Sequence, residues 1–144
     1  MQRLKRFFWV GVLMMFALPW TPVEAFHKDV YEPRVPEPLL EELQDMDNPF
    51  PPTPENIEAG RKIFFGKGYC VLCHGKDGKS LEIPGHDPRN FTDMRWQDAR
   101  TDGEMMWVLK NGSPGTSMPI RIGKVISEEE GWKVILFIRT LAGK

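Results

Sequence analysis

The stretch CVLCHG, residues 70–75, holds both cysteines of this 144-residue chain, with two residues between them and a histidine directly behind the second. A disulfide is the first use to consider for a cysteine pair. The loop between Cys70 and Cys73 is so short, however, that cross-linking it would remove little entropy from the unfolded chain. The pair is therefore a poor structural staple, and its spacing needs a chemical explanation.

Cys-x-x-Cys-His is the attachment sequence of a c-type haem, and each of its parts has a chemical reason. The two thiols add across the two vinyl groups of the porphyrin and form thioethers. In a helical segment, Cys70 and Cys73 lie on one face and reach the same edge of the ring. His74 is then held beneath the ring, where an imidazole nitrogen can coordinate the iron. We predict one covalently bound haem c, attached through Cys70 and Cys73, with His74 as an axial ligand.

A zinc knuckle and a thioredoxin-like redox pair are the alternatives for the same motif. A structural zinc site needs four ligands, and only His27 and His86 remain as further imidazole donors. A thioredoxin-like pair belongs near a βαβ pattern, which this sequence lacks. The motif therefore favours haem.

The iron needs a sixth ligand, and the segment NGSPGTSMP, residues 111–119, is suited to provide it. Its glycines and prolines forbid a regular helix and impose turns, which leaves Met118 on a shaped loop. A methionine thioether is a soft ligand, and pairing it with histidine raises the reduction potential of the iron. We predict Met118 as the second axial ligand.

Four other side chains compete with Met118 for this role. Met105 and Met106 fall inside an amphipathic helical pattern, where methionine usually fills a core. Met94 falls in a polar segment that we interpret as a loop without matching turn residues. His86 would make a bis-histidine centre, but it lies only twelve residues after His74 in a stretch with prolines at 84 and 88, which hinder its path around the ring. A loop histidine on the surface is the simpler interpretation of His86.

Helical signals dominate from Thr53 onward. Thr53-Pro54 is an N-cap followed by proline and predicts a helix to about Phe65. Capping-box sequences at 101–104 and 127–130 begin a middle helix and a last helix whose apolar residues have helical spacing. No stretch alternates with period two for long enough to be a strand. The predicted fold class is all-α, with about four to five short helices around the haem.

The N-terminus has the order of a secretory signal peptide. A basic start is followed by an apolar run and then by a cleavage site with small residues. This order predicts that residues 1–25 are the signal peptide and that cleavage occurs after Ala25. The apolar run is about half of what spans a bilayer, so an uncleaved anchor is the alternative and we expect no membrane span after cleavage. The mature chain is mildly acidic, which does not suggest nucleic acid as a partner. These features indicate export to the periplasm.

Residues 26–53 form an acidic, proline-rich arm ahead of the domain predicted at 54–144. Proline restricts the backbone, so most of this arm should be extended, with one or two helical turns within 38–46. The domain itself carries a slight positive charge. We expect the arm either to lie on the domain or to reach for a partner.

The order of these features over residues 54–144 resembles a class I cytochrome c, and HGKDGK and PRNFTD are similar to segments of the small bacterial periplasmic monohaem members. The resemblance implies that the first and last helices cross, with Gly60 and Phe64 meeting Val134 and Phe137. It also implies that a backbone carbonyl accepts a hydrogen bond from the haem histidine. Pro88 is the predicted source of this carbonyl, in preference to Pro84.

Some polar and aromatic side chains are expected around the cofactor. A buried indole seeks a hydrogen-bond partner, and we predict that Trp96 lies in the haem pocket and donates to a propionate. Five lysines flank the segments around the expected haem edge and are either a docking ring for acidic redox proteins or an ordinary solvated surface: Lys67, Lys76, Lys79, Lys110 and Lys124.

With both axial positions filled, such a protein is an electron carrier and not an enzyme. The predicted function is one-electron transfer between redox protein partners in a periplasmic respiratory chain, by a monomer. The alternative is a cytochrome subunit of a larger oxidoreductase complex, attached through the arm. A gas- or peroxide-reactive haem protein is a third hypothesis, which carbon monoxide binding would distinguish.

Overall fold

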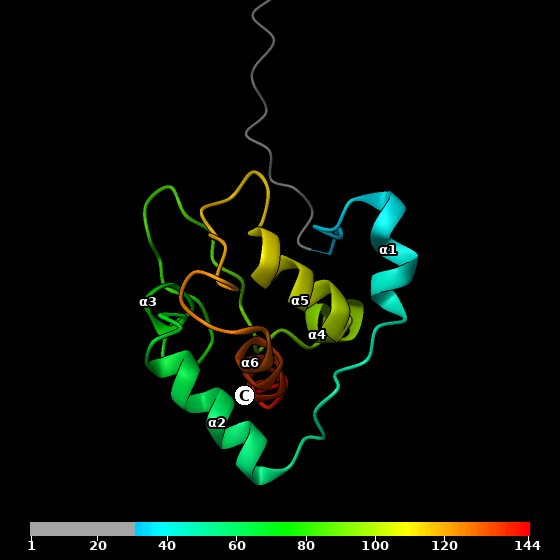
Figure 1. Ribbon diagram of the computed structural model, residues 1–144. Coiled ribbons are helices and arrows are strands. Elements are labelled where there is room, and N and C mark those ends of the chain that lie inside the picture. Colours follow the sequence, from blue (N-terminus) through cyan, green and yellow to red (C-terminus); the bar gives the residue numbers. More distant parts are fainter. Residues whose placement is uncertain (1–30) are drawn as a thin grey trace, which may run out of the picture.

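Six helices occur in residues 31–144, the part of the chain that this computed structural model describes (Figure 1). The predicted signal peptide, its cleavage point and His27 lie outside the described residues. Within 31–144 there is no strand, and two isolated bridges link Ile83 with His86 and Ile122 with Ile126. The all-α prediction is confirmed. The helices are α1 (Glu37–Gln44), α2 (Pro54–Phe65), α3 (Val71–His74), α4 (Met94–Ala99), α5 (Asp102–Asn111) and α6 (Glu128–Arg139).

The three longest helices begin at the predicted caps. The Thr53 hydroxyl accepts a hydrogen bond from a backbone N–H in the first turn of α2. Thr101 and Glu104 form a reciprocal capping box at the start of α5, and Ser127 and Glu130 form another at the start of α6. Each cap satisfies backbone donors that the first helical turn leaves without partners. Local sequence therefore determines where these helices start.

The centre of the fold is the crossing of α2 and α6. An added Cβ on Gly60 would run into the backbone carbonyl of Lys133, so glycine is what allows the two helices to approach this closely. One turn later Phe64, with 0% of its surface exposed, meets the ring of Phe137 edge-on with centroids 5.2 Å apart. Val134 is also fully buried. The crossing implied by the resemblance is confirmed.

The short helix α4 is a correction to the sequence analysis, which placed Met94 in a loop. The helix begins at Met94, and the Asp93 carboxylate accepts hydrogen bonds from the backbone N–H groups of Arg95 and Trp96. Six residues are too few to show an amphipathic period, so pattern alone does not reveal such a helix. Its effect is to turn Trp96 inward.

The described part of the acidic arm lies on the domain. Helix α1 rests against α5, where Gly103 leaves no room for a Cβ beside the Leu43 carbonyl. That carbonyl also accepts a hydrogen bond from the Thr101 hydroxyl at 3.0 Å. Further along, Asn48 Nδ2 donates to the Trp132 carbonyl at 3.1 Å. Of the two expectations for the arm, packing on the domain is the one observed for residues 31–53.

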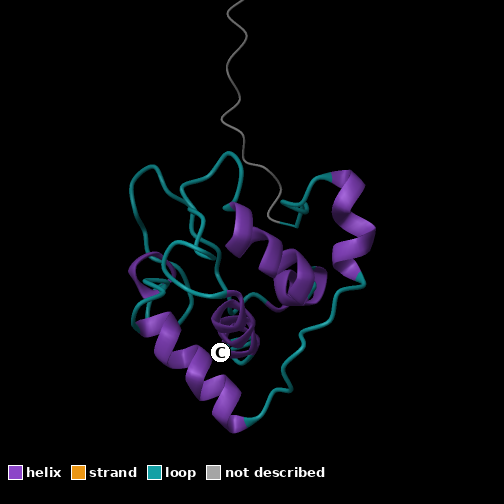
Figure 2. Ribbon diagram, in the orientation of Figure 1, coloured by secondary structure: helices purple, strands orange, loops and turns teal. Residues whose placement is uncertain are grey.

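Long loops occupy the side of the molecule opposite the start of α2 (Figure 2). They are the segment between α3 and α4 and the segment between α5 and α6. Among the helices of residues 31–144, none is long and apolar enough to cross a membrane.

Candidate functional site

A mostly apolar cavity lies between α3 on one side and the Met118 loop on the other. It encloses about 1220 Å³ of space, the part open to solvent included. Its walls come from the arm, from α3, α5 and α6, and from both long loops, so distant segments of the chain face this one space. All six predicted site residues line it: Cys70, Cys73, His74, Pro88, Trp96 and Met118.

His74 ends α3 with its ring buried and oriented from two directions. Its Nδ1 lies 2.9 Å from the Arg89 carbonyl oxygen, and its ring stacks on Phe91 with centroids 4.2 Å apart and planes 21° apart. Burial lowers the pKa of this imidazole. A neutral ring that donates from Nδ1 keeps the lone pair of Nε2 for a metal. The geometry therefore suits an axial ligand.

The carbonyl beside His74 corrects the prediction for Pro88. It belongs to Arg89, the next residue, while Pro88 contributes to the cavity wall. Residues 75–93 contain no helix, and no periodic pattern sets which carbonyl of such a loop faces inward. The sequence located the loop correctly and missed the register by one residue.

The two cysteines open onto the cavity as free thiols. Cys70 is buried, and burial raises the pKa of its thiol to about 11. The thiol is therefore protonated at neutral pH, unlike the low-pKa thiolates of redox-active pairs. Within residues 31–144, no three His, Cys, Asp or Glu side chains lie together as a metal site. The buried Cys70 thiol therefore suits a neutral thioether better than a metal thiolate.

Met118 sits on a loop that hydrogen bonds hold in shape. The Ser113 N–H donates to the Met118 carbonyl at 3.0 Å, and the Met118 N–H donates to the Thr116 hydroxyl at 3.2 Å. Gly112 has a φ of +75°, and a Cβ there would lie 2.9 Å from the Met118 carbonyl oxygen. The turn chemistry expected from the sequence is thus present.

The competing ligands are distributed differently. Met105 also lines the cavity from α5, whereas Met106 is buried in the core and Met94 lies half-exposed away from the cavity. His86 lines the cavity from an exposed position on its loop. Met105 and His86 therefore also lie next to the site, and the choice of Met118 over them stays a prediction.

Four arginines line the cavity that the sequence analysis did not single out: Arg34, Arg89, Arg100 and Arg121. Two of them carry buried nitrogens without a hydrogen-bond partner among the described residues, Arg100 Nη2 and Arg121 Nε. An unpaired buried guanidinium nitrogen is costly, so such atoms call for an anionic or polar partner. A haem, which combines an apolar ring with two carboxylates, fits this cavity. No helical period marks these arginines, which come from four separate segments.

Trp96 is buried at the cavity wall, tilted 44° against Phe91 with ring centroids 5.6 Å apart. The Arg89 guanidinium lies over its indole ring, 5.9 Å from the ring centroid. Trp96 thus contributes to the pocket as predicted, while its hydrogen bond to a propionate stays a prediction.

The five flanking lysines do not form a uniform ring. Lys67 pairs with Glu130 at 2.6 Å, and Lys110 pairs with Glu128 at 2.7 Å. The other three make no ion pair within residues 31–144 and are exposed: Lys76, Lys79 and Lys124. Both interpretations of these lysines therefore stay open.

Comparisons with known proteins also indicate a c-type cytochrome. Residues 55–138 match the family model described as "Cytochrome C oxidase, cbb3-type, subunit III". A search of the curated proteins found no match.

Three of the similar solved structures illustrate the match. The KustC0563 c-type cytochrome is 26% identical, with a TM-score of 0.50 over 58% of this chain and 96% of that one. A chain of the Kuenenia stuttgartiensis reducing HAO-like protein complex is 26% identical, with a TM-score of 0.54 over 67% of this chain and 49% of that one, so the match spans about half of that chain. Cytochrome CL from Methylophaga aminisulfidivorans, at 17% identity and a TM-score of 0.52 over 74% of this chain and 64% of that one, shares the fold.

Proposed function

This chain belongs to the family described as cytochrome c oxidase, cbb3-type, subunit III, and we propose that it acts as a freestanding one-electron carrier of a periplasmic respiratory chain. As a c-type cytochrome it binds haem c covalently and transfers electrons. The observation that carries the proposal is the cavity closed by His74 on one side and by the Met118 loop on the other.

We assign the haem contacts from the geometry of this cavity. Cys70 and Cys73 are proposed as the thioether sites and His74 and Met118 as the axial ligands. Bound haem supplies one-electron chemistry through its iron. The protein itself excludes water from the ring, orients the His74 imidazole through Arg89 and Phe91, and holds the Met118 thioether in place.

A carrier follows from this ligand set because neither axial position is left for a substrate. The Met118 loop is held by two hydrogen bonds and by the turn at Gly112, so its displacement by a small molecule is costly. This argues against the gas- or peroxide-reactive alternative. Signal cleavage and the periplasmic location remain part of the proposal.

The second candidate is a cytochrome subunit of a larger redox complex, which one comparison favours. The similar Kuenenia chain is part of a protein complex, and this chain matches about half of it. The structure gives less support to attachment through the arm, because residues 31–53 pack against the chain's own helices. Under this candidate the partner would bind another face.

The experiment is to express the full chain with a c-type haem assembly system and isolate it from the periplasm under native conditions. A carrier should elute as a small monomer with one haem by mass, and its reduced form should not bind carbon monoxide. The Met118→Ala variant should bind carbon monoxide and serves as the positive control. Rapid binding by the wild type would reject the closed ligand set, and elution in a large assembly would favour the subunit candidate.

A further inference from the structure

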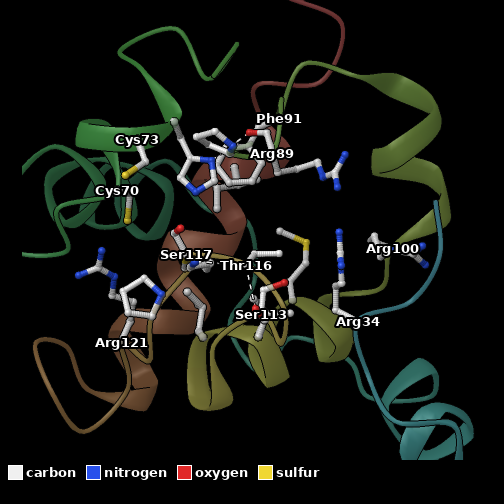
Figure 3. Close-up of a pocket in the computed structure, with 18 of the residues that line it drawn as sticks. Arg34, Cys70, Cys73, Arg89, Phe91, Arg100, Ser113, Thr116, Ser117 and Arg121 are labelled. Carbon is white, nitrogen blue, oxygen red and sulfur yellow. Dashed lines mark hydrogen bonds between the residues drawn. The ribbon is translucent and has the colours of Figure 1, made fainter. Parts of the chain in front are cut away.

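Three of the cavity's arginines gather at the side opposite the cysteines. Figure 3 shows the sulfur atoms of Cys70 and Cys73 at one side, and the guanidinium groups of Arg34, Arg89 and Arg100 at the other. These arginines come from the arm, from the loop before α4 and from the residue that follows α4. Only the folded chain brings them together.

Carboxylates lie near these three guanidinium groups, because Glu32, Asp87 and Glu104 line the same cavity, but within residues 31–144 they leave one guanidinium nitrogen without a partner. Arg100, 8% exposed, pairs with the buried Glu104 at 3.2 Å and donates to the Ala99 carbonyl at 2.7 Å, yet its Nη2 is buried without a partner among the described residues. This buried nitrogen calls for a hydrogen-bond acceptor, and a carboxylate placed beside the arginine cluster would supply one.

The haem itself supplies suitable anions. Its two vinyl groups and its two propionates lie on opposite halves of the ring. When Cys70 and Cys73 hold the vinyl half, the propionates point to the opposite side of the cavity, where the arginines are. Arginine guanidinium groups bind carboxylates through two parallel hydrogen bonds.

Arg34 stands apart because it precedes the family match, which begins at residue 55. The arm holds it in place: the adjacent Val35 is buried at the cavity wall, and α1 is tied to α5 through the Leu43 carbonyl. We propose that the N-terminal arm is a cover for the haem, and that its Arg34 completes with Arg89 and Arg100 the site for the haem carboxylates. The arm thereby helps to set the reduction potential.

The sign of this effect follows from charge. Oxidation adds one positive charge to the iron, so a nearby guanidinium disfavours the oxidised form and raises the potential. Removing the charge, or opening the cover to water, favours the oxidised form. Loss of the cation also raises the pKa of the carboxylate it binds, which makes the potential more dependent on pH near neutrality.

The test uses the full holoprotein and three variants, each of which replaces one arginine. Arg34→Gln removes the proposed carboxylate ligand, and Arg34→Lys keeps its charge without the paired hydrogen bonds. Arg61→Gln is the matched control, because Arg61 lies exposed on α2 and pairs with Glu58. Midpoint potentials are measured across neutral pH by redox titration of the visible spectrum.

We expect Arg34→Gln to lower the midpoint potential and steepen its pH dependence, relative to both wild type and Arg61→Gln, with Arg34→Lys in between. Equal potentials and equal pH slopes in Arg34→Gln and Arg61→Gln would overturn the proposal. Hydrogen exchange on the wild-type holoprotein needs no variant: the backbone amides of residues 39–43 in α1 should be protected, and their exchange at the unprotected rate would equally overturn the proposal.

The inference rests on the haem being bound as proposed, and the same samples separate the two failures. Haem mass and a low-spin spectrum report on attachment and axial ligation. If these are present while Arg34→Gln behaves like Arg61→Gln, the cover is wrong and the carrier stands. If they are absent in the wild type, the proposed ligand set is wrong.

Discussion

Gly60 of α2 lies directly against the backbone carbonyl of Lys133 in α6, with no space between them for a Cβ atom. Because the obstacle is backbone, a side chain at this position must push the two helices apart. The Phe64–Phe137 contact, one turn along the same crossing, would open with them. The close packing of α2 against α6 therefore depends on glycine at position 60.

Gly60→Ala should therefore lower the free energy of unfolding by more than about 3 kcal/mol, beyond the usual cost of overpacking. Gly115→Ala is the control, because Gly115 has a φ of +75° and no atom within 4 Å of an added Cβ. Backbone strain alone should cost it about 1–2 kcal/mol. Denaturant unfolding of both holoproteins gives the comparison, and a smaller loss for Gly60→Ala contradicts the close approach.

Met118→Ala should abolish the low-spin visible spectrum and lower the midpoint potential, because the thioether ligand is lost. The control is Met105→Leu, which keeps the volume of the other cavity methionine and should cost under about 1.5 kcal/mol in stability. Its spectrum should match that of the wild type. Spectra and redox titrations of the two variants decide between them. Loss of the low-spin spectrum in Met105→Leu but not in Met118→Ala would instead identify Met105 as the iron ligand.

Glu104→Gln should destabilise the protein by about 3 kcal/mol, because it replaces the carboxylate of the buried Glu104–Arg100 ion pair with a neutral amide. Glu104 is 2% exposed, and its other oxygen accepts a 2.8 Å hydrogen bond from the Thr101 N–H, which glutamine can still satisfy. Glu58→Gln, at an exposed pair with Arg61, should make no measurable difference. Chemical denaturation at neutral pH measures the free energy of unfolding of both variants. Equal losses in Glu104→Gln and Glu58→Gln would contradict the role of burial.

The surroundings of Glu130 predict that this residue makes a pH-dependent contribution to stability. The Lys67 ammonium, with which Glu130 forms a hydrogen bond, holds the pKa of that carboxyl below its usual value of 4.5, and the Ser127 N–H acts in the same direction. The ionised form therefore stabilises the fold. The stabilisation is complete above pH 4.5 and is lost as the pH falls through the lowered pKa.

Glu130→Gln should thus cost under about 1 kcal/mol at neutral pH, since the group is near the surface. Its unfolding curve should converge with that of the wild type in acid. Lys67→Gln should reproduce most of the loss, because it removes the main cause of the shift. Unfolding free energies measured from pH 7 downward check this. A difference that is independent of pH would mean that the charge of Glu130 is not involved.

Features that depend on neighbouring residues could be predicted from the sequence. The haem motif needs only spacing along one helical turn, so Cys70, Cys73 and His74 follow from the order of residues in a single short segment. The caps of α2, α5 and α6 bond backbone groups within three residues, and the loop of Met118 is shaped by its own glycines and prolines. Such interactions are local in space because they are local in the chain.

Which distant groups share a site depends instead on the tertiary structure. The Arg89 carbonyl, and not that of Pro88, meets His74 because the path of an irregular loop is set by the surfaces it crosses. Arg34, Arg89 and Arg100 are brought to one side of the cavity by the arm, the loop and α4, and no sequence period links them. Burial and charge act through space, so the pairing of these groups is established only when the chain has folded.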